Sequence, residues 1–238
     1  MKNNSDYALI TASTGGVGGG FIRPLANKRG YHTYLQYRPE SESKRKESEE
    51  RYPSDNVTYF PSSLTDEEQL VGFFQKIASE QIIFTIMVLA AGAPGIDPEN
   101  KSQEESIADF KAANFLTKKV PITAFLLANP LPPKKRIHLF LICSHVALYT
   151  DEFLADHKQD FGNQIGYIYS MRDVYEYGKW LIEHCSEYFI VHIEFTEQVE
   201  TKGYDRLRSQ LKEANKIDIG IGIDPEVYAE KVLTNAGL

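Results

Sequence analysis

The sequence predicts an α/β protein with a doubly wound parallel sheet and helices on both faces. Apolar runs of strand length alternate along the chain with stretches of helical apolar spacing, and this order favours parallel strands joined by crossover helices. A glycine-rich loop also follows the first expected strand, where a sheet of this kind can cradle a phosphate group. Together these two observations indicate a Rossmann fold, which binds ligands beyond the carboxyl ends of its strands.

Six apolar segments are expected to form the strands, and helices are expected between them. The strands are Tyr7–Thr11, His32–Tyr37, Val57–Phe60, Ile83–Leu89, Ile137–Cys143 and Ile190–Phe195. The helices are Gly18–Arg29, Ser41–Arg51, Thr65 to about Ser79, Glu104–Ala128, Val174–Glu187 and Asp224–Asn235. Turn and cap residues set several boundaries: Gly30 stops the first helix, a capping box opens the third at Thr65, and Asp224 with Pro225 begins the last.

Composition narrows the class of protein further. The chain has 238 residues, 42% of them hydrophobic, so one domain over residues 1–238 is expected. Its net charge of −7 argues against nucleic acid as a partner, and no apolar run is long enough for a membrane span. The polar N-terminus and two cysteines favour a cytoplasmic location, and no His, Cys or carboxylate spacing predicts a metal site.

The loop after the first strand is the clearest functional signal. It runs from Thr11 through Ala12, Ser13 and Thr14 to the glycines that precede the first helix. Glycine permits a tight turn there and lets backbone N–H groups approach a pyrophosphate, and the helix start adds a partial positive charge. A flexible glycine linker is the alternative, but the position between strand and helix favours dinucleotide binding.

The end of the second strand indicates which dinucleotide is bound. The residues there are Tyr37 and Arg38, where an acidic side chain would hold the ribose 2′-hydroxyl of NAD. An arginine instead accommodates a 2′-phosphate, and Lys44 and Arg45 follow closely. NADP(H) is therefore favoured over NAD(H), with an ordinary surface arginine as the alternative.

The segment Tyr7–Gly18 (YALITASTGGVG) resembles the opening of the short-chain dehydrogenase/reductase family, with its Thr-Gly-x-x-x-Gly-x-Gly loop. Ala12 replaces the first glycine of that pattern, so the turn is expected to survive with some strain. The resemblance continues in order along most of the chain, through Leu64-Thr65-Asp66, Val88–Gly92, Asn114, Ile142-Cys143-Ser144, Val199 and Thr201, and Asp224–Leu233. The cofactor contacts that it implies are Thr11, Ser13, Thr14, Gly16, Val17, Gly18, Arg38, Leu64, Ala91, Gly92, Val199 and Thr201.

The resemblance implies a catalytic serine, a structural or catalytic asparagine, and a tyrosine followed four residues later by a lysine. Ser144 and Asn114 match the first two. Tyr175 and Lys179 have the required spacing and are the preferred pair, because four residues bring phenol and ammonium to one helix face. The rival is Tyr169, whose register puts Asp173 where lysine belongs. An aspartate there would raise the pKa of the tyrosine, the opposite of what proton transfer requires.

Residues 149–167 separate Ser144 from either tyrosine and are expected to form a substrate-side loop, with a surface insertion of no role as the alternative.

The resemblance implies an NADPH-dependent oxidoreductase that acts on a small-molecule carbonyl or alcohol. Departures from the motifs, including Ala12, Ser63, Ala90 and Asp173, leave a catalytically impaired cofactor-binding or scaffolding subunit as the alternative. Members of that family commonly pair through the helices after the fourth and fifth strands, so a homo-oligomer is a further expectation.

Overall fold

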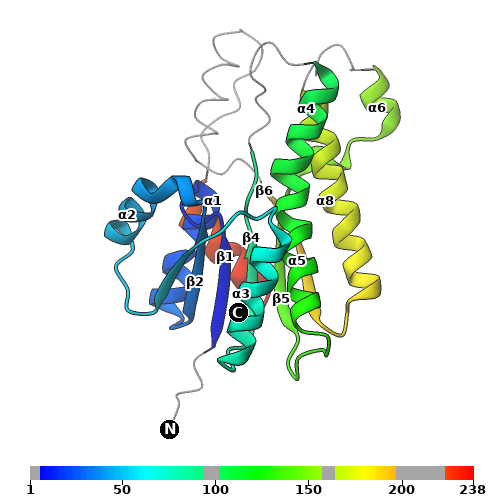
Figure 1. The fold of residues 1–238 in the computed structure, drawn as a ribbon. Coiled ribbons are helices and arrows are strands. Elements are labelled where there is room, and N and C mark those ends of the chain that lie inside the picture. Colours follow the sequence, from blue (N-terminus) through cyan, green and yellow to red (C-terminus); the bar gives the residue numbers. More distant parts are fainter. Residues whose placement is uncertain (1–5, 94–101, 157–163, 197–222) are drawn as a thin grey trace.

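A six-stranded parallel sheet runs through the computed structural model, which describes residues 6–93, 102–156, 164–196 and 223–238 (Figure 1). The strands are β1 (Tyr7–Thr11), β2 (His32–Tyr37), β3 (Val57–Pro61), β4 (Phe84–Leu89), β5 (Ile137–Ser144) and β6 (Phe189–Thr196). Their order is β3-β2-β1-β4-β5-β6, and every neighbouring pair is parallel. This order confirms the doubly wound Rossmann fold. It reverses between β1 and β4, so the carboxyl ends of these two strands mark the switch point.

One face of the sheet is covered by α3 (Glu67–Ser79), α5 (Thr117–Ala128) and α8 (Ile165–His184). The helix α4 (Gln103–Phe110) contacts α8 and continues into α5 through the π-helical segment η3 (Lys111–Leu116). Figure 1 shows α4, α5 and α8 as one side of the molecule. The buried core on this face includes Leu9, Met87 and Leu139 from the strands and Phe74, Phe125 and Val174 from the helices.

The other face is covered by α1 (Gly16–Gly20), the π-helical η1 (Arg23–Lys28) and α10 (Pro225–Asn235). The second core takes the alternate strand residues, among them Ala8, Ile10, Val88 and Phe140, and packs them against Phe21, Leu25 and Val232. Strands that are buried on both faces need apolar residues at consecutive positions, which explains the apolar runs at residues 8–10, 86–89 and 139–143. The remaining elements are η2 (Pro39–Ser41), α2 (Glu42–Arg51), η4 (His145–Leu148) and α6 (Asp151–Asp156).

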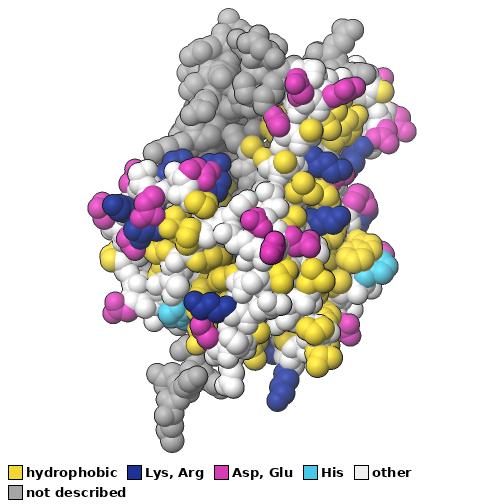
Figure 2. Space-filling view, viewed as in Figure 1, with side chains coloured by type: hydrophobic (Ala, Val, Ile, Leu, Met, Phe, Trp, Pro, Cys, Tyr) yellow, Lys and Arg dark blue, Asp and Glu magenta, His cyan; other side chains and the backbone are white. Residues whose placement is uncertain are grey.

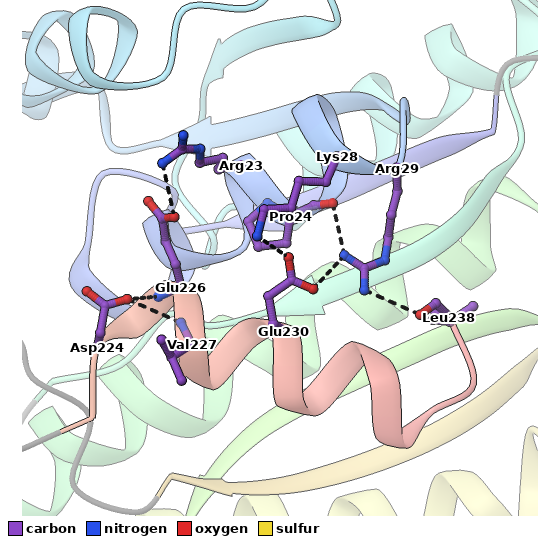
Figure 3. A network of polar contacts seen from close by, with 9 residues as sticks. All are labelled: Arg23, Pro24, Lys28, Arg29, Asp224, Glu226, Val227, Glu230 and Leu238. Carbon is purple, nitrogen blue, oxygen red and sulfur yellow. Dashed lines mark hydrogen bonds and ion pairs between the residues drawn. The ribbon is translucent and has the colours of Figure 1, made fainter.

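Polar contacts join the last helix to η1 and the residue that follows it (Figure 3). Glu230 of α10 accepts from Lys28 at 2.7 Å and from Arg29 at 2.8 Å. Asp224 caps α10, because its side chain accepts from the backbone N–H groups of Glu226 and Val227. The predicted cap at Asp224 is therefore confirmed.

The first helix begins at Gly16 and not at the expected Gly18, and two further predicted helix starts also differ from the structure. The N-cap of α3 is Asp66, whose side chain accepts from Gln69 N, and not Thr65. The last long helix before β6 begins at Ile165, nine residues before the expected Val174, so part of the expected 149–167 loop is helical. The left-handed Gly30, with a φ of 70°, lies just beyond η1 and confirms the predicted stop of the first helix.

The surface in view carries charged side chains of both signs as well as hydrophobic ones. The hydrophobic side chains gather on the side formed by α5 and α8 (Figure 2). The large exposed hydrophobic residues of these two helices are Leu127, Tyr169, Trp180 and Ile182. Among the described residues, no helix is long and apolar enough to cross a bilayer. Within the same residues, no group of three or more His, Cys, Asp or Glu side chains could hold a metal ion.

Candidate functional site

Gln36 of β2 holds the loop after β1 in one shape. The backbone N–H of Ala12 donates to the Gln36 side-chain oxygen at 2.8 Å. The N–H and hydroxyl of Ser13 both donate to the Gln36 carbonyl, at 3.0 and 2.9 Å. Ala12 has a φ of 51°, in the left-handed region that glycine occupies at lower cost. The strained turn expected from the Ala12 substitution is therefore present.

Gly18 allows the first helix to approach the end of β1. A Cβ atom at this position would lie 2.6 Å from the Ala12 carbonyl oxygen and 2.8 Å from that of Thr11, so only glycine fits. The approach presents the helix start and the exposed Gly15 and Gly16 beside the strand end. This cradle fits a dinucleotide pyrophosphate, which needs close backbone and free N–H groups.

The predicted cofactor residues of this loop divide into two groups. The Thr11 hydroxyl accepts from Ala90 N at 3.1 Å, and the Ser13 hydroxyl is bound to Gln36, so both hold the loop together. Thr14 and Val17 are partly exposed and remain accessible to a ligand. These assignments stay predictions about contacts with a cofactor.

Arg38 follows β2 and points a largely exposed guanidinium toward Glu40, with Nε 3.4 Å from the carboxylate. This exposed pair is weak in water, so the side chain is free to turn to a phosphate. Arg45 differs, because it binds Glu42 at 2.8 Å and Glu49 at 2.5 Å and lies over the ring of Tyr59. Arg38 is therefore less engaged by carboxylates than Arg45, and its contact with a 2′-phosphate stays a prediction.

Asn114 joins the end of β4 to α8. Its side-chain oxygen accepts from Ala93 N at 2.8 Å, and its amide nitrogen donates to the Ser170 hydroxyl at 3.0 Å. The Ser170 hydroxyl in turn donates to the Tyr167 carbonyl at 2.7 Å. A Cβ atom at Gly92 would lie 2.8 Å from the Asn114 oxygen, so a larger residue there would displace the Asn114 side chain. Of the other residues predicted nearby, Leu64 and Ala91 are buried and Gly92 is exposed.

Lys118 lies one helical turn after Asn114 and is fully buried, with 1% of its surface exposed. Its ammonium donates to the carbonyl oxygens of Ala91 at 2.5 Å and Asn114 at 3.0 Å. Burial lowers the pKa of Lys118 to about 8, and an electrostatic interaction with Cys143 partly opposes this. Sequence analysis did not select this residue.

Ser144, at the end of β5, interacts with Tyr167 in the first turn of α8. Burial raises the pKa of the Tyr167 phenol, and a side-chain hydrogen bond with Ser144 acts in the opposite direction. The preceding Gly166 lets α8 approach α4, because a Cβ atom there would lie 2.9 Å from Ile107 Cα. The Tyr167 ring also packs edge-on to Phe110, with centroids 5.8 Å apart. The Tyr167 side chain therefore lies near Ser144, at the carboxyl end of β5.

The tyrosines selected from the sequence make other contacts. Tyr175 packs against Phe195 with ring centroids 5.8 Å apart, and the Lys179 ammonium lies 4.9 Å from the Tyr175 ring centroid. Phenol and ammonium therefore share one helix face, but Lys179 is exposed and binds Glu176 at 2.7 Å. Tyr169 is 39% exposed. Catalytic roles for Tyr169, Tyr175 and Lys179 stay predictions.

Sequence reasoning placed Tyr167 in a loop, because the helix was expected to begin at Val174. One usable signal was the serine three residues after Tyr167. This serine, Ser170, accepts a hydrogen bond from the Asn114 amide. Asp173, the residue that weakened the Tyr169 register, is paired with Lys111 at 3.5 Å. The predicted cofactor residues Val199 and Thr201 lie outside the described residues, as do residues 157–163 of the expected loop.

No protein-family model and no curated protein matches the chain. Several solved structures do match the chain. The actinorhodin polyketide ketoreductase, as a variant with NADPH, aligns with a TM-score of 0.77 and 17% identity over 97% of this chain and 90% of its own. A short-chain dehydrogenase from Streptomyces avermitilis aligns with a TM-score of 0.74 and 14% identity, over 100% of this chain and 85% of its own.

An alcohol dehydrogenase from the archaeon Thermococcus sibiricus, complexed with 5-hydroxy-NADP, aligns with a TM-score of 0.69 and 18% identity. The alignment covers 99% of this chain and 92% of that one. The chain therefore has the fold of the short-chain dehydrogenases and reductases.

Proposed function

We propose that the chain is an NADPH-dependent oxidoreductase of the short-chain dehydrogenase/reductase type, which reduces the carbonyl group of a small molecule. The observation that carries this proposal is the position of Ser144 at the end of β5 and of Tyr167 in the first turn of α8, close enough for the two side chains to interact. The glycine loop at the neighbouring switch point supplies a place for the dinucleotide. Solved structures of the same fold that hold NADPH or NADP also support the proposal.

Each hydroxyl has a distinct part in the reduction. Ser144 donates a hydrogen bond to the substrate carbonyl oxygen and so orients and polarises the carbonyl. Tyr167 gives its proton to the same oxygen, as a general acid, and the product is an alcohol. When bound, NADPH supplies the hydride for the carbonyl carbon.

The preference for NADPH rests on Arg38. Its guanidinium is exposed at the end of β2 and carries only a weak surface ion pair with Glu40. A 2′-phosphate offers a stronger, bidentate partner for an arginine. The proposal extends to a cytoplasmic location and to a homo-oligomer, for which the hydrophobic side of α5 and α8 is available.

The second candidate is a cofactor-binding subunit without turnover. The observation that favours it is on α8, where Met171 stands four residues after Tyr167 and is buried. A cation at that position would favour loss of the phenol proton, and methionine cannot provide one. Lys179, the lysine with the expected spacing from Tyr175, is engaged in a surface ion pair with Glu176.

The purified full chain distinguishes the two candidates. NADPH binding is measured by titration calorimetry, and NADPH oxidation is followed by absorbance with a panel of ketones and aldehydes. Oxidation with at least one carbonyl compound supports the reductase, provided that it is absent without the compound. Binding without oxidation of any panel member supports the subunit without turnover, and absence of binding contradicts both.

A further inference from the structure

Gln36 places a fully buried amide inside the sheet, and both ends of that amide are bonded. The residue lies on β2 and is 0% exposed. Its side-chain oxygen accepts from Ala12 N at 2.8 Å, and its side-chain nitrogen donates to the Ser62 carbonyl oxygen at 2.5 Å. An apolar side chain would be more favourable at a buried position, unless the hydrogen bonds of the amide are themselves needed.

These two bonds join segments that lie far apart along the chain. Ala12 comes directly after β1 and Ser62 directly after β3, and β2 lies between these two strands. The orientation of the Gln36 amide is fixed, because an N–H group faces one end of it and a carbonyl oxygen faces the other. Both contacts lie beyond the carboxyl ends of the strands, where a Rossmann fold binds its ligand.

The contact with Ala12 restrains a strained turn. Ala12 has a φ of 51°, a conformation that a residue with a Cβ atom keeps only when its surroundings hold it there. The Gln36 side chain binds the Ala12 N–H, and the Gln36 main-chain carbonyl binds that of Ser13. Without the side-chain bond, the turn would be free to relax. The glycine loop would then lose the shape that fits a pyrophosphate.

The contact with Ser62 fixes the opposite segment. Ser62 is fully buried, and its N–H donates to the Tyr37 carbonyl oxygen at 3.0 Å. Its hydroxyl donates to the Gln69 side-chain oxygen at 2.9 Å, and the same oxygen accepts from Ser63 N at 3.1 Å. A series of hydrogen bonds therefore runs from the glycine loop through Gln36 and Ser62 to α3.

We infer that Gln36 is a positioning residue for the dinucleotide, which holds the glycine loop and the segment after β3 in place before the cofactor binds. The inference rests on the proposed function. Arg38 comes two residues after Gln36, so the residue expected to bind the 2′-phosphate leaves the sheet between the two anchored segments. A site that is already formed has less freedom to lose when its ligand binds, so binding should weaken when these bonds are lost.

The experiment compares the full wild-type chain with three variants. Gln36→Met removes both side-chain bonds at similar length. Gln36→Glu keeps the acceptor for Ala12 N, but it offers a donor to the Ser62 carbonyl only while its carboxyl is protonated. Thr33→Val is the matched control, because it removes a hydrogen bond of another fully buried polar residue, near the amino end of the same strand.

Two quantities are measured for each protein between about pH 5.5 and pH 8.5, the range in which a buried carboxyl can titrate. Titration calorimetry gives the dissociation constant of NADP⁺, which unlike NADPH is stable in acid. Chemical denaturation reports the fold and the free energy of unfolding. Each dissociation constant is compared with that of the wild type at the same pH, so that the titration of groups common to all four proteins cancels.

Gln36→Met should weaken NADP⁺ binding about tenfold at every pH. In Gln36→Glu, burial raises the pKa of the introduced carboxyl above its ordinary value of about 4.3. In acid the protonated carboxyl replaces the amide, and binding should lie within about threefold of the wild type. At higher pH the ionised carboxyl repels the Ser62 carbonyl oxygen, and binding should be at least about tenfold weaker than in the wild type. Thr33→Val should match the wild type throughout.

A folded Gln36→Met that binds NADP⁺ like the wild type would overturn the inference. Weakening in Gln36→Glu alone would then reflect direct repulsion of the cofactor phosphates by the new charge. Gln36→Glu binding that keeps a constant ratio to the wild type at all pH values would also overturn it. So would equal weakening in Thr33→Val, or failure of both Gln36 variants to fold, because Gln36 would then support the strand and not the cofactor site.

Oxidation of NADPH with a carbonyl compound by the wild type separates this inference from the proposed function. Where such oxidation occurs and binding does not depend on Gln36, the inference fails and the proposed function stands. Binding that depends on Gln36 as expected, without oxidation by any carbonyl compound, would support the inference and reject the reductase. A wild type that binds no dinucleotide would reject both.

Discussion

His138 of β5 and His192 of β6 stack on each other, with ring centroids 5.3 Å apart and planes 9° from parallel. Nδ1 of His138 lies 3.1 Å from Nε2 of His192, close enough for one proton to bridge the two rings. Two charged rings would repel at this distance, so the pair is stable with at least one ring neutral.

Because of this pair, we expect the free energy of unfolding to fall in acid. Burial lowers the pKa of His138, with Lys135 and Arg136 adding to the effect, and burial followed by the charge of His138 lowers the pKa of His192. As the pH falls through about 6.5, the unfolded histidines take up protons before the folded ones do. The free energy of unfolding therefore falls from about pH 6.5 downward, until the pH lies below the folded pKa values.

The measurement is chemical denaturation at several pH values for the wild type, His192→Phe and the surface control His184→Phe. His192→Phe should reduce the loss of stability below pH 6.5, and His184→Phe should leave it unchanged. Some dependence should persist, because burial also lowers the pKa of His32. Equal pH dependence in all three proteins would mean that the stacked pair does not control it.

Ala12→Gly should stabilise the chain. A left-handed φ costs an alanine roughly 1–2 kcal/mol, and the greater freedom of glycine in the unfolded state takes back about 0.4–1 kcal/mol. The net gain in the free energy of unfolding should be about 0.5–1 kcal/mol, measured by denaturation. The control Ala26→Gly, within η1, should lower that free energy by a similar amount. A destabilised Ala12→Gly protein would show that the loop depends on the alanine methyl group.

Arg38→Asp should weaken NADPH binding far more than NADH binding. The substitution removes a charge-assisted contact to the 2′-phosphate worth about 1.5–3 kcal/mol and leaves every contact common to both cofactors. Lys76→Asp makes the same change of charge at an exposed position of α3 and should affect both cofactors weakly and equally. Both dissociation constants are measured by calorimetry, and an equal loss in Arg38→Asp would place the arginine away from the phosphate.

The strands could be predicted because their signal is local. Tyr7–Thr11 and His32–Tyr37 have the expected bounds, because both are short segments rich in β-branched, aromatic and other apolar residues, although His32–Tyr37 also buries Thr33 and Gln36. Asp224 and Gly30 were also readable, because caps and left-handed stops depend on one residue type at one place. These features place the sheet and its switch point, and with them the region of the site.

The site itself depends on contacts between distant segments. Ile165–Asp173 has a weak helical signal that includes Gly166, and it is helical because that glycine packs on Ile107 of α4. Without that contact between distant segments, the sequence predicted a loop at Tyr167. Lys118 and Lys119 read alike as surface lysines, and only the packing of α5 buries one of them. A cap shows the same limit, since Thr65 and Asp66 are both good cap residues and the local turn selects Asp66.

The central claim is that Ser144 and Tyr167 form the proton-donating pair of an NADPH-dependent reductase. The most direct test is NADPH oxidation with a reactive carbonyl compound by the wild type, Tyr167→Phe and Tyr175→Phe, with NADPH binding measured beside it. We predict that Tyr167→Phe loses about 100-fold or more in kcat, binds NADPH normally and stays folded, whereas Tyr175→Phe keeps most of its activity. A Tyr167→Phe protein that retains wild-type turnover, with Tyr175→Phe inactive, would contradict the claim and return the proton-donating role to Tyr175.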